Sequence, residues 1–224
     1  MLTLFSIIIL SYLVGSIPTG LIIGKAVKGI DIRNFGSSST GGTNVSRLLG
    51  WKFGLLVIIL DAIKGAIAVI FIARLYYLGS MPFENPTPFD DFTFVQIIAG
   101  MSAVIGHIWT IFAQFRGGKG IATVLGFLVS LITIEALFAF GIFLLVVTIS
   151  RYVSLGSIIA AISVPIILVI RATVFHIEIP GYNIILPFVI FVAVLVIYTH
   201  RKNIDRLFSG KEKRFSFKKK IKIT

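Results

Sequence analysis

Long apolar runs recur along the whole chain, separated by short basic or glycine-rich segments. The runs cover residues 2–24, 53–78, 92–115, 121–150, 155–173 and 184–200. An α-helix of about 20 apolar residues crosses a hydrocarbon core of about 30 Å. The polar segments between the runs are too short to bury a core of their own. The sequence therefore predicts an all-α integral membrane protein, in which residues 1–224 form a single polytopic membrane domain.

The composition agrees with a membrane protein and bounds its chemistry. The chain is 57% hydrophobic and only 13% charged, against about 45–50% and about 25% in soluble domains. Its net charge of +12 comes from cations that lie between the apolar runs and in the basic tail at 201–224. Such cations set topology and meet anionic lipid, so we expect membrane lipid and no nucleic acid as a partner. The chain has no cysteine, which excludes disulfides, thiolate metal sites and a cysteine nucleophile.

Basic residues set the expected orientation of the helices. Lys25 and Lys28 follow the first run and no cation precedes it, which favours a retained helix with its N-terminus outside. The run at 121–150 is either one long span or two short helices that turn near Glu135. Two short helices keep every basic segment on the cytoplasmic side. We therefore predict seven transmembrane helices with a cytoplasmic C-terminus, at residues 2–24, 53–78, 92–115, 121–133, 135–150, 155–173 and 184–200.

Two features inside the runs carry further predictions. Pro18 is expected to kink the first helix near its inner end. Asp61 and Lys64 lie three residues apart on the second helix, so their side chains share a face. Because unpaired charges are costly in a bilayer, the two should form a structural pair that faces the helix bundle. The acidic segment at 79–91 and the segment at 174–183 should lie outside.

A glycine-rich, basic stretch follows the third apolar run. Gly117, Gly118 and Gly120 leave backbone amides unshielded, and Arg116 and Lys119 add positive charge. The next apolar run supplies a helix N-terminus. Bare amides, a helix N-terminus and cations together indicate an anion site, most naturally for phosphate. The plainer interpretation is a tight cytoplasmic turn with ordinary positive-inside charges.

Other polar segments are expected on the same face of the membrane. Residues 36–47 are dense in hydroxyl side chains and glycine and end in Arg47. Residues 151–157 and 200–206 add further basic and hydroxyl side chains, among them His200. A basic, glycine-rich face of this kind suits a substrate that bears phosphate. The cytoplasmic segments offer no group of aspartates, so we expect no metal.

The ordered set of motifs resembles the acyl-phosphate-dependent glycerol-3-phosphate acyltransferases of bacterial membranes. The matching segments occur in the family's order and span nearly the whole chain: residues 15–18, 36–47, 61–65, 106–107, 115–123, 150–157 and 200–207. The first loop departs from the usual family pattern at Ser38, Ser39, Thr40 and Gly42. Thr110 stands where a proline is usual, and Arg116 replaces a common lysine.

The resemblance implies a fold, a reaction and a location. Members have seven helices, and their active site faces the cytoplasm from the bacterial cell membrane. They move a fatty acyl group from acyl phosphate to the sn-1 hydroxyl of glycerol 3-phosphate, giving lysophosphatidic acid and phosphate in the first acylation step of phospholipid synthesis. No cofactor is implied. The partners implied are the two substrates, membrane lipid and, by functional coupling, the enzyme that makes acyl phosphate.

The residue chemistry and the resemblance together assign the site. The catalytic residues expected are Ser37, Arg47, Lys119, His200 and Asn203. Binding of substrate or phosphate is expected from Thr43, Asn44, His107, Arg116, Gly117, Gly118 and Gly120.

Individual roles follow from side-chain chemistry. Lys119 and the glycine amides around it should hold a phosphate, and Arg47 should clamp one through two hydrogen bonds. His200 either acts as the general base or leaves that role to a substrate phosphate. Asn203 lies one helical turn from His200, so both should share a face at the end of the last span.

Alternatives from the residues alone remain. Ser37 would bind or orient substrate, and a role as nucleophile lacks a visible triad spacing. Thr43 and Asn44 donate to phosphate, cap the following helix, or do both. For the whole chain, the runner-up is a small anion transporter or phosphate channel, although the sequence has no internal repeat. A scaffold that senses anionic lipid through its tail is the third hypothesis.

Overall fold

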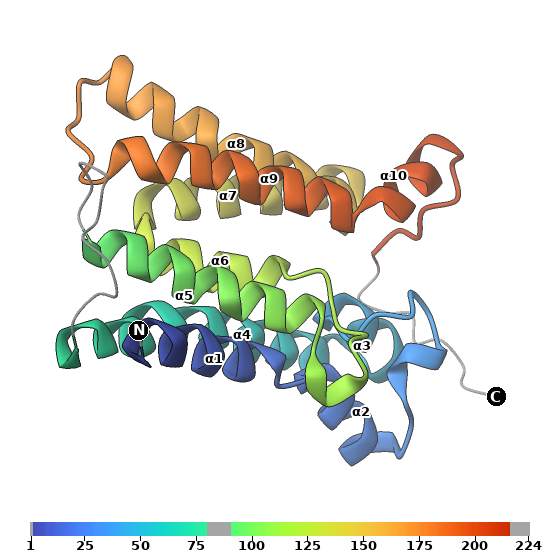
Figure 1. The fold of residues 1–224 in the computed structure, drawn as a ribbon. Helices are drawn as coiled ribbons and strands as arrows, with labels where there is room; N and C mark the ends of the chain where they lie inside the picture. Colours follow the sequence, from blue (N-terminus) through green and yellow to red (C-terminus); the bar gives the residue numbers. More distant parts are fainter. Residues whose placement is uncertain (1, 80–90, 216–224) are drawn as a thin grey trace. The chain divides into compact units, whose positions relative to one another are not determined.

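The computed structural model describes residues 2–79 and 91–215, and within these ranges the chain is helical with no β-strand. The chain divides into two compact units. Of the described residues, unit 1 comprises 2–79 and 95–130, and unit 2 comprises 91–94 and 131–215. Figure 1 traces the helices in chain order. Residues 80–90 of the predicted exterior segment 79–91, and residues 216–224 at the end of the basic tail, lie outside the described residues.

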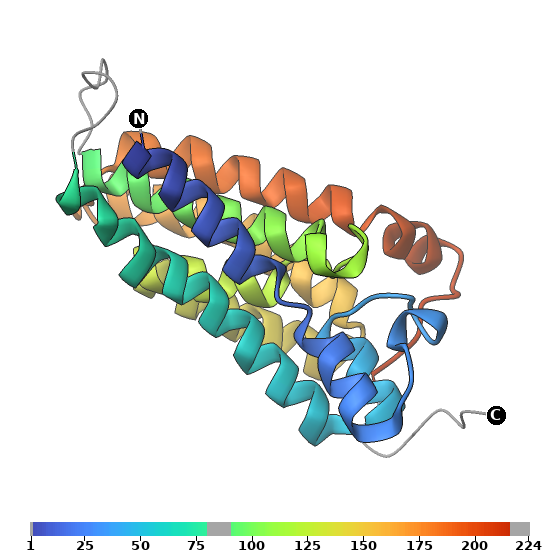
Figure 2. The ribbon, with the colours of Figure 1, turned by 60° about the horizontal axis from the view of Figure 1, so that its bottom comes forward.

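Unit 1 contains the first half of the helices. The elements are α1 (Leu2–Ser16), α2 (Thr19–Lys28), η1 (Ile32–Asn34), α3 (Gly42–Leu49), α4 (Trp51–Ile67), η2 (Ala68–Ile72), η3 (Ala73–Leu78), α5 (Asp91–Ile108, which begins in unit 2), η4 (Ile111–Ala113) and α6 (Ile121–Leu131). Helices α2, α3 and α4 contact one another at one end of this unit (Figure 2). A small apolar core of Ile32, Val45, Leu48 and Val57 fills the space between α3, α4 and η1.

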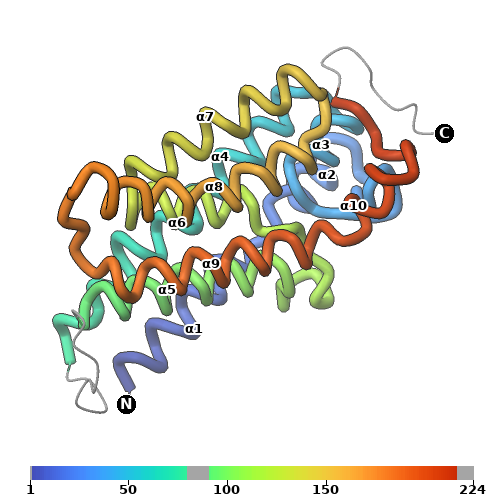
Figure 3. Tube along the Cα trace, turned by 90° about the horizontal axis from the view of Figure 1, so that it is seen from above, coloured from blue at the N-terminus to red at the C-terminus, as the bar shows by residue number. Residues whose placement is uncertain are grey.

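Unit 2 is a layer of three long helices with a short helix at its end. The elements are α7 (Thr133–Ser150), α8 (Val153–Thr173), α9 (Tyr182–Thr199) and α10 (Arg201–Phe208). Helix α8 packs against both α7 and α9, and α10 continues beyond the end of α9 (Figure 3). The buried carboxylate of Glu135, in the first turn of α7, pairs with Arg171 near the end of α8. This pair closes the end of the α7–α8 hairpin that lies away from α10.

In the part of the chain that the structure describes, six helical stretches are long and apolar enough to cross a membrane: 2–28, 51–78, 91–113, 133–150, 153–173 and 182–199. Helix α6 is apolar but has only 11 residues. Large apolar side chains are exposed along these helices, as a lipid environment requires; Phe138 on α7 is 64% exposed and Ile149 is 77% exposed. Length and composition therefore support the predicted all-α membrane architecture.

The helix bounds differ from the expected ones in three places. The first run forms two helices, because α1 ends at Ser16 and α2 begins at Thr19. Pro18 was expected only to kink one helix, but it lies in a break between two. The run at 121–150 breaks at Ile132. The run therefore forms two helices, as expected, but the first has 11 residues and the second has 18 residues. The expected basic tail contains a helix, α10, whose exposed face carries most of its charge.

Helices α4 and α6 approach closely inside unit 1 because each has a glycine at the contact. A Cβ atom added at Gly65 would lie 2.1 Å from the carbonyl oxygen of Thr123, and one at Gly126 would lie 1.8 Å from that of Ala62. Small residues let helix backbones come together where lipid provides no hydrophobic drive for helix association.

Gly126→Ala is expected to lower the free energy of unfolding by about 1–3 kcal/mol, because the added methyl group overpacks the contact with α4. Thermal unfolding in detergent measures the change. Gly141→Ala is the matched control, since a Cβ atom there meets nothing within 4 Å. Equal unfolding midpoints for the two variants would contradict the close α4–α6 contact.

Candidate functional site

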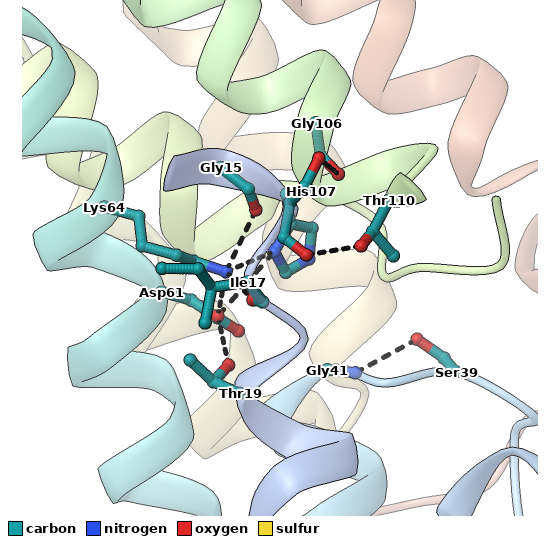
Figure 4. Close-up of polar contacts among 11 residues, drawn as sticks. Gly15, Ile17, Thr19, Ser39, Gly41, Asp61, Lys64, Gly106, His107 and Thr110 are labelled. Carbon is teal, nitrogen blue, oxygen red and sulfur yellow. Dashed lines mark hydrogen bonds and ion pairs between the residues drawn. The ribbon is translucent and has the colours of Figure 1, made fainter. Parts of the chain in front are cut away.

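The break between α1 and α2 opens three backbone carbonyls to side chains. Pro18 has no N–H to donate, so the helical hydrogen-bond ladder stops there. The Lys64 ammonium fills the gap: its Nζ lies 3.3 Å from the Gly15 oxygen and 2.8 Å from the Ile17 oxygen (Figure 4). The remaining carbonyl, that of Ser16, accepts a hydrogen bond from the Thr110 hydroxyl.

The same ammonium forms a buried ion pair. Lys64 Nζ lies 2.7 Å from Asp61 Oδ1, with side chains 5% and 2% exposed. The Thr19 hydroxyl donates to the same carboxylate oxygen. His107 Nδ1 lies 3.4 Å from Lys64 Nζ and 3.7 Å from Asp61 Oδ1. The predicted structural pair is confirmed, and it joins α4 to the α1–α2 break and to α5.

The glycine-rich connection packs against the His107 ring and hydrogen-bonds to the His107 backbone. The Gly118 amide donates to the His107 oxygen and the Gly117 amide to the Ile108 oxygen, both at 3.1 Å. A Cβ atom at Gly118 would lie 2.1 Å from His107 Nε2, so only glycine permits this approach. These two amides serve the loop itself. Both amides donate to carbonyls of the same chain here, and the expectation that they bind a phosphate stays a prediction.

The rest of the connection leads into a helix as expected. Gln114 and Phe115 have φ angles of 57° and 58°, and Gly120 has a φ of 81°. The Gly120 oxygen accepts the first hydrogen bond of α6, from the Val124 amide at 2.7 Å. Lys119 is half-buried beside the start of α6, whereas Arg116 is exposed. A cation beside a helix N-terminus is the part of the predicted anion site that the structure retains.

Asn44 organises the first loop of the site. Its Nδ2 lies within 2.9–3.2 Å of the carbonyl oxygens of Ile32, Phe35 and Ser39, and its Oδ1 accepts from the Ser37 amide at 3.0 Å. Asn44 is only 1% exposed. Its side chain therefore holds the loop that carries Ser37.

Neither polar residue at the start of α3 caps that helix. The N-cap residue is Gly41, which makes no side-chain hydrogen bond to the helix. Thr43 and Asn44 already lie within its first turn, so the expectation that they cap it is wrong. Thr43 and Arg47 are half-buried on α3.

Arg33 links the first loop to the glycine-rich connection. Its Nη1 donates to the Ala113 oxygen at 2.7 Å, while Nε and Nη2 bind the Asp31 carboxylate at 2.6–3.1 Å. The hydrogen bonds from Arg33 lower the pKa of the Asp31 carboxyl despite its partial burial. Sequence reasoning missed this residue, although Asp31 is the only acid in a basic segment and Arg33 follows it two residues later.

His200 and Asn203 belong to unit 2. Helix α9 ends at Thr199, His200 is the junction, and Asn203 lies on the separate helix α10. The two residues were expected to share a face at the end of the last span; His200 lies at the junction and Asn203 on the next helix, and the shared face stays a prediction. His200 Nδ1 lies 2.8 Å from the Val196 oxygen. Because a carbonyl only accepts, Nδ1 carries a proton in this contact.

Three donors in unit 2 converge on one carboxylate that sequence reasoning did not select. Glu212 Oε1 accepts from Ser154 Oγ at 2.8 Å and from Asn203 Nδ2 at 2.7 Å. Glu212 Oε2 lies 2.7 Å from Arg206 Nε. Burial alone would raise the pKa of Glu212, but the hydrogen bonds from Arg206, Asn203 and Ser154 outweigh it and lower the pKa. Only its position as one of two acids in the basic tail at 201–224 could have drawn attention to it.

The structure thus groups the expected residues by unit. Unit 1 holds Ser37, Thr43, Asn44, Arg47, His107, Arg116, Gly117, Gly118, Lys119 and Gly120, and unit 2 holds His200 and Asn203. Among residues 2–79 and 91–215, no three histidine, aspartate or glutamate side chains gather as metal ligands.

Known proteins resemble the chain over almost its whole length. The family model described as Glycerol-3-phosphate acyltransferase matches residues 5–210. A relative of that name from Chlorobaculum tepidum is 48% identical over 238 residues, covering 98% of this chain and 100% of the relative. Another, from Chlorobium phaeobacteroides strain DSM 266, is 45% identical over 97% of this chain and 98% of its own.

Two solved structures share the fold. One is the glycerol 3-phosphate form of PlsY (YgiH), an integral membrane glycerol 3-phosphate acyltransferase; it is 38% identical, with a TM-score of 0.78 over 96% of both chains. The other is the lysophosphatidic acid form of PlsY, which is 37% identical, with a TM-score of 0.76 over 97% of both chains.

Lys64→Met is expected to lower the free energy of unfolding by about 3–5 kcal/mol, because it leaves the Asp61 carboxylate buried without its cation. Adding Asp61→Asn should recover part of the loss, since the second change removes the uncompensated charge. Chemical or thermal unfolding in detergent measures both. Lys52→Met, at an exposed lysine of the same helix, serves as the control; a loss no larger than the control's would contradict the buried pair.

Gly118→Ala is expected to speed amide hydrogen exchange at Gly117 and Gly118, because the added methyl group pushes the loop off His107 and breaks both carbonyl bonds. Exchange followed by mass spectrometry over residues 114–120 measures it. Gly41→Ala is the control, since its Cβ atom would meet only Ser39 Oγ at an ordinary 3.6 Å. Unchanged exchange in Gly118→Ala would show that the loop does not depend on this contact.

Proposed function

The chain belongs to the glycerol-3-phosphate acyltransferase family, and on that premise we propose that it transfers a fatty acyl group from acyl phosphate to the sn-1 hydroxyl of glycerol 3-phosphate. The products are lysophosphatidic acid and inorganic phosphate. The observation that carries the proposal is the likeness, over 96–97% of both chains, to PlsY structures named for their glycerol 3-phosphate and lysophosphatidic acid forms. These two ligands are the acceptor and the product of this reaction.

The reaction needs positioning more than covalent activation. Acyl phosphate is a mixed anhydride with phosphate as its leaving group. The acceptor hydroxyl attacks the acyl carbonyl carbon, an ester C–O bond forms, the C–O bond to phosphate breaks, and the hydroxyl proton passes to a base. Holding the substrates in line and stabilising the charge on the carbonyl oxygen and the departing phosphate supply most of the acceleration.

In unit 1, Lys119 and Arg47 are the proposed phosphate ligands. Lys119 lies beside the N-terminus of α6, where the helix dipole adds to its charge. The guanidinium fork of Arg47 suits two oxygens of one phosphate. Arg116 adds an exposed cation to the same connection. Gly120 is the last residue before α6 and lets the chain enter that helix with a positive φ.

The remaining expected residues of unit 1 act on substrate or position the loops that do. Ser37 orients substrate through its hydroxyl, on a loop that the Asn44 side chain holds through polar contacts with three carbonyls and the Ser37 amide. Thr43 binds substrate from the first turn of α3. His107 supports Gly117 and Gly118, and so sets where Lys119 stands.

In unit 2, His200 is the proposed general base. The contact between its Nδ1 and the Val196 oxygen orients the ring, and an imidazole suits proton transfer near pH 7. Asn203 holds and orients glycerol 3-phosphate. A substrate phosphate is the alternative proton acceptor.

The proposal includes a membrane arrangement. The chain is a multi-pass membrane protein. We place it in the bacterial cell membrane as a single domain over residues 1–224, with seven helices, the N-terminus outside, and the site and tail 201–224 facing the cytoplasm. Helix α6 is the seventh, short helix in this arrangement. The grouping of basic residues in the connections 25–52 and 114–120 and in the tail supports this orientation. The acyl donor comes from the enzyme that makes acyl phosphate, to which this step is functionally coupled.

Purified protein incubated with palmitoyl phosphate and labelled glycerol 3-phosphate, without metal or coenzyme A, is expected to form labelled lysophosphatidic acid. Lys119→Met and Arg47→Ala should each lower kcat/KM by about 10²–10³-fold, because each removes a charge that stabilises phosphate in the transition state. Lys28→Met, at an exposed lysine of α2, should leave the rate unchanged.

Two results would contradict the proposal at different levels. If no lysophosphatidic acid forms while proteoliposomes containing the protein conduct phosphate, the transfer reaction itself is wrong. If product forms and both variants keep full activity, the reaction stands and the phosphate ligands lie elsewhere.

A further inference from the structure

Ser154, Asn203 and Arg206 form an anion-binding arrangement that lies wholly within unit 2. Ser154 lies in the first turn of α8, while Asn203 and Arg206 lie three residues apart on α10. Two neutral donors and one guanidinium point at a single position, close to the N-terminus of α8. Such a set binds any oxyanion of suitable size, whether a carboxylate or a phosphate.

The group that occupies this position comes from outside the helical framework. Glu212 follows the end of α10, in the segment 209–215, which we call the strap. The strap turns at Gly210, which has a φ of 67°. The amides of Lys211 and Glu212 donate to the Arg206 oxygen at 2.8 and 3.0 Å, and the Phe215 amide donates to the Arg151 oxygen at 2.7 Å. The strap therefore runs from α10 back to the α7–α8 corner.

Charge distinguishes Glu212 from the rest of the strap. Lys211, Lys213 and Arg214 are cationic and exposed, and Arg214 lies over the Tyr152 ring. Glu212 is the only acid after Asp205 in the chain, and its side chain is 5% exposed. The one anion of a basic segment is thus the side chain that enters the arrangement.

We propose that the Glu212 carboxylate is an internal competitor of glycerol 3-phosphate, which it mimics at the Ser154, Asn203 and Arg206 donors. The proposal rests on the proposed function, in which Asn203 binds this substrate. A substrate phosphate and the carboxylate require the same hydrogen-bond donors, so one must leave before the other binds. The apparent affinity for substrate is then reduced by the fraction of molecules in which the strap is seated.

Substrate can displace the carboxylate because its phosphate brings more negative charge and more acceptor oxygens to the same donors. A phosphate monoester carries close to two negative charges and three terminal oxygens, against one charge and two oxygens for a carboxylate. Apart from Glu212, the strap is held by backbone hydrogen bonds to the Arg206 and Arg151 carbonyls and by the contact of Arg214 with Tyr152. None of these contacts uses the side chain of a donor that binds Glu212, so the strap can open and leave the three donors in place. At a high concentration of glycerol 3-phosphate the Glu212 carboxylate is displaced. At a low concentration the carboxylate stays bound and lowers the rate of the reaction.

Glu212→Gln tests the competitor in the full-length protein. The change keeps the shape of the side chain but removes its charge and weakens its bond to Arg206. The KM for glycerol 3-phosphate is expected to fall by about 3- to 30-fold, as the competent fraction rises. The kcat at saturating glycerol 3-phosphate and the KM for palmitoyl phosphate should not change. Glu178→Gln, at an exposed acid of the same unit, is the matched control and should behave as the wild type.

Phe215→Pro provides a second variant that leaves the donors intact. Proline removes the amide that ties the strap to Arg151, so the strap loosens while Glu212 remains. The KM for glycerol 3-phosphate should fall here too, by less than in Glu212→Gln. Equilibrium binding of labelled glycerol 3-phosphate, without an acyl donor, should tighten in the same order and does not depend on turnover.

The outcomes separate this proposal from the proposed function. If wild-type protein makes lysophosphatidic acid but Glu212→Gln has an unchanged or higher KM and unchanged or weaker binding, Glu212 is a brace for α10 and the competitor is refuted. If wild-type protein forms no lysophosphatidic acid, the proposed function fails. Tighter glycerol 3-phosphate binding in Glu212→Gln would still support competition in that case.

Discussion

The Lys64 ammonium is the group on which the polar contacts between the helices of unit 1 depend. It sits where Pro18 interrupts the first helix, and it binds two carbonyls that the interruption leaves open. Asp61, one turn earlier on α4, neutralises it. Removing two charges from water is costly, and only close pairing with additional hydrogen bonds offsets that cost. The backbone break and the ion pair therefore stabilise each other, and neither is favourable alone inside a membrane.

Polar contacts connect this ion pair to the loops of unit 1. His107 faces Asp61 and Lys64 with Nδ1 and supports Gly118 with its other side. Arg33 then joins the first loop to the same connection through Ala113. Helices in lipid gain little from burying apolar surface against one another. Small residues and buried hydrogen bonds consequently define how these elements meet, which explains the density of glycine at the helix contacts.

Unit 2 uses the same kind of chemistry for a different purpose. Its buried pair of Glu135 and Arg171 fastens two long helices. Its second buried carboxylate, Glu212, belongs to the short strap that follows α10. Segments outside the packed helices open at a lower free-energy cost than the helices themselves. A carboxylate held this way is suited to leave, whereas Glu135 is not.

The sequence alone determined what depends on local spacing. Apolar runs of membrane-crossing length fixed the helical architecture, Asp61 and Lys64 three residues apart fixed their pairing, and the ordered motifs fixed the family. The tertiary structure decided which partner each polar group takes. In the folded chain the Gly117 and Gly118 amides donate to carbonyls of α5. The Asn44 side chain binds the backbone of the first loop, and Asn203 lies on a separate helix from the last long one. Arg33 and Ala113 are 80 residues apart, and Ser154 and Glu212 are 58 apart. No local pattern encodes such contacts, because a hydrogen bond forms only where the folded backbone brings donor and acceptor within about 3 Å.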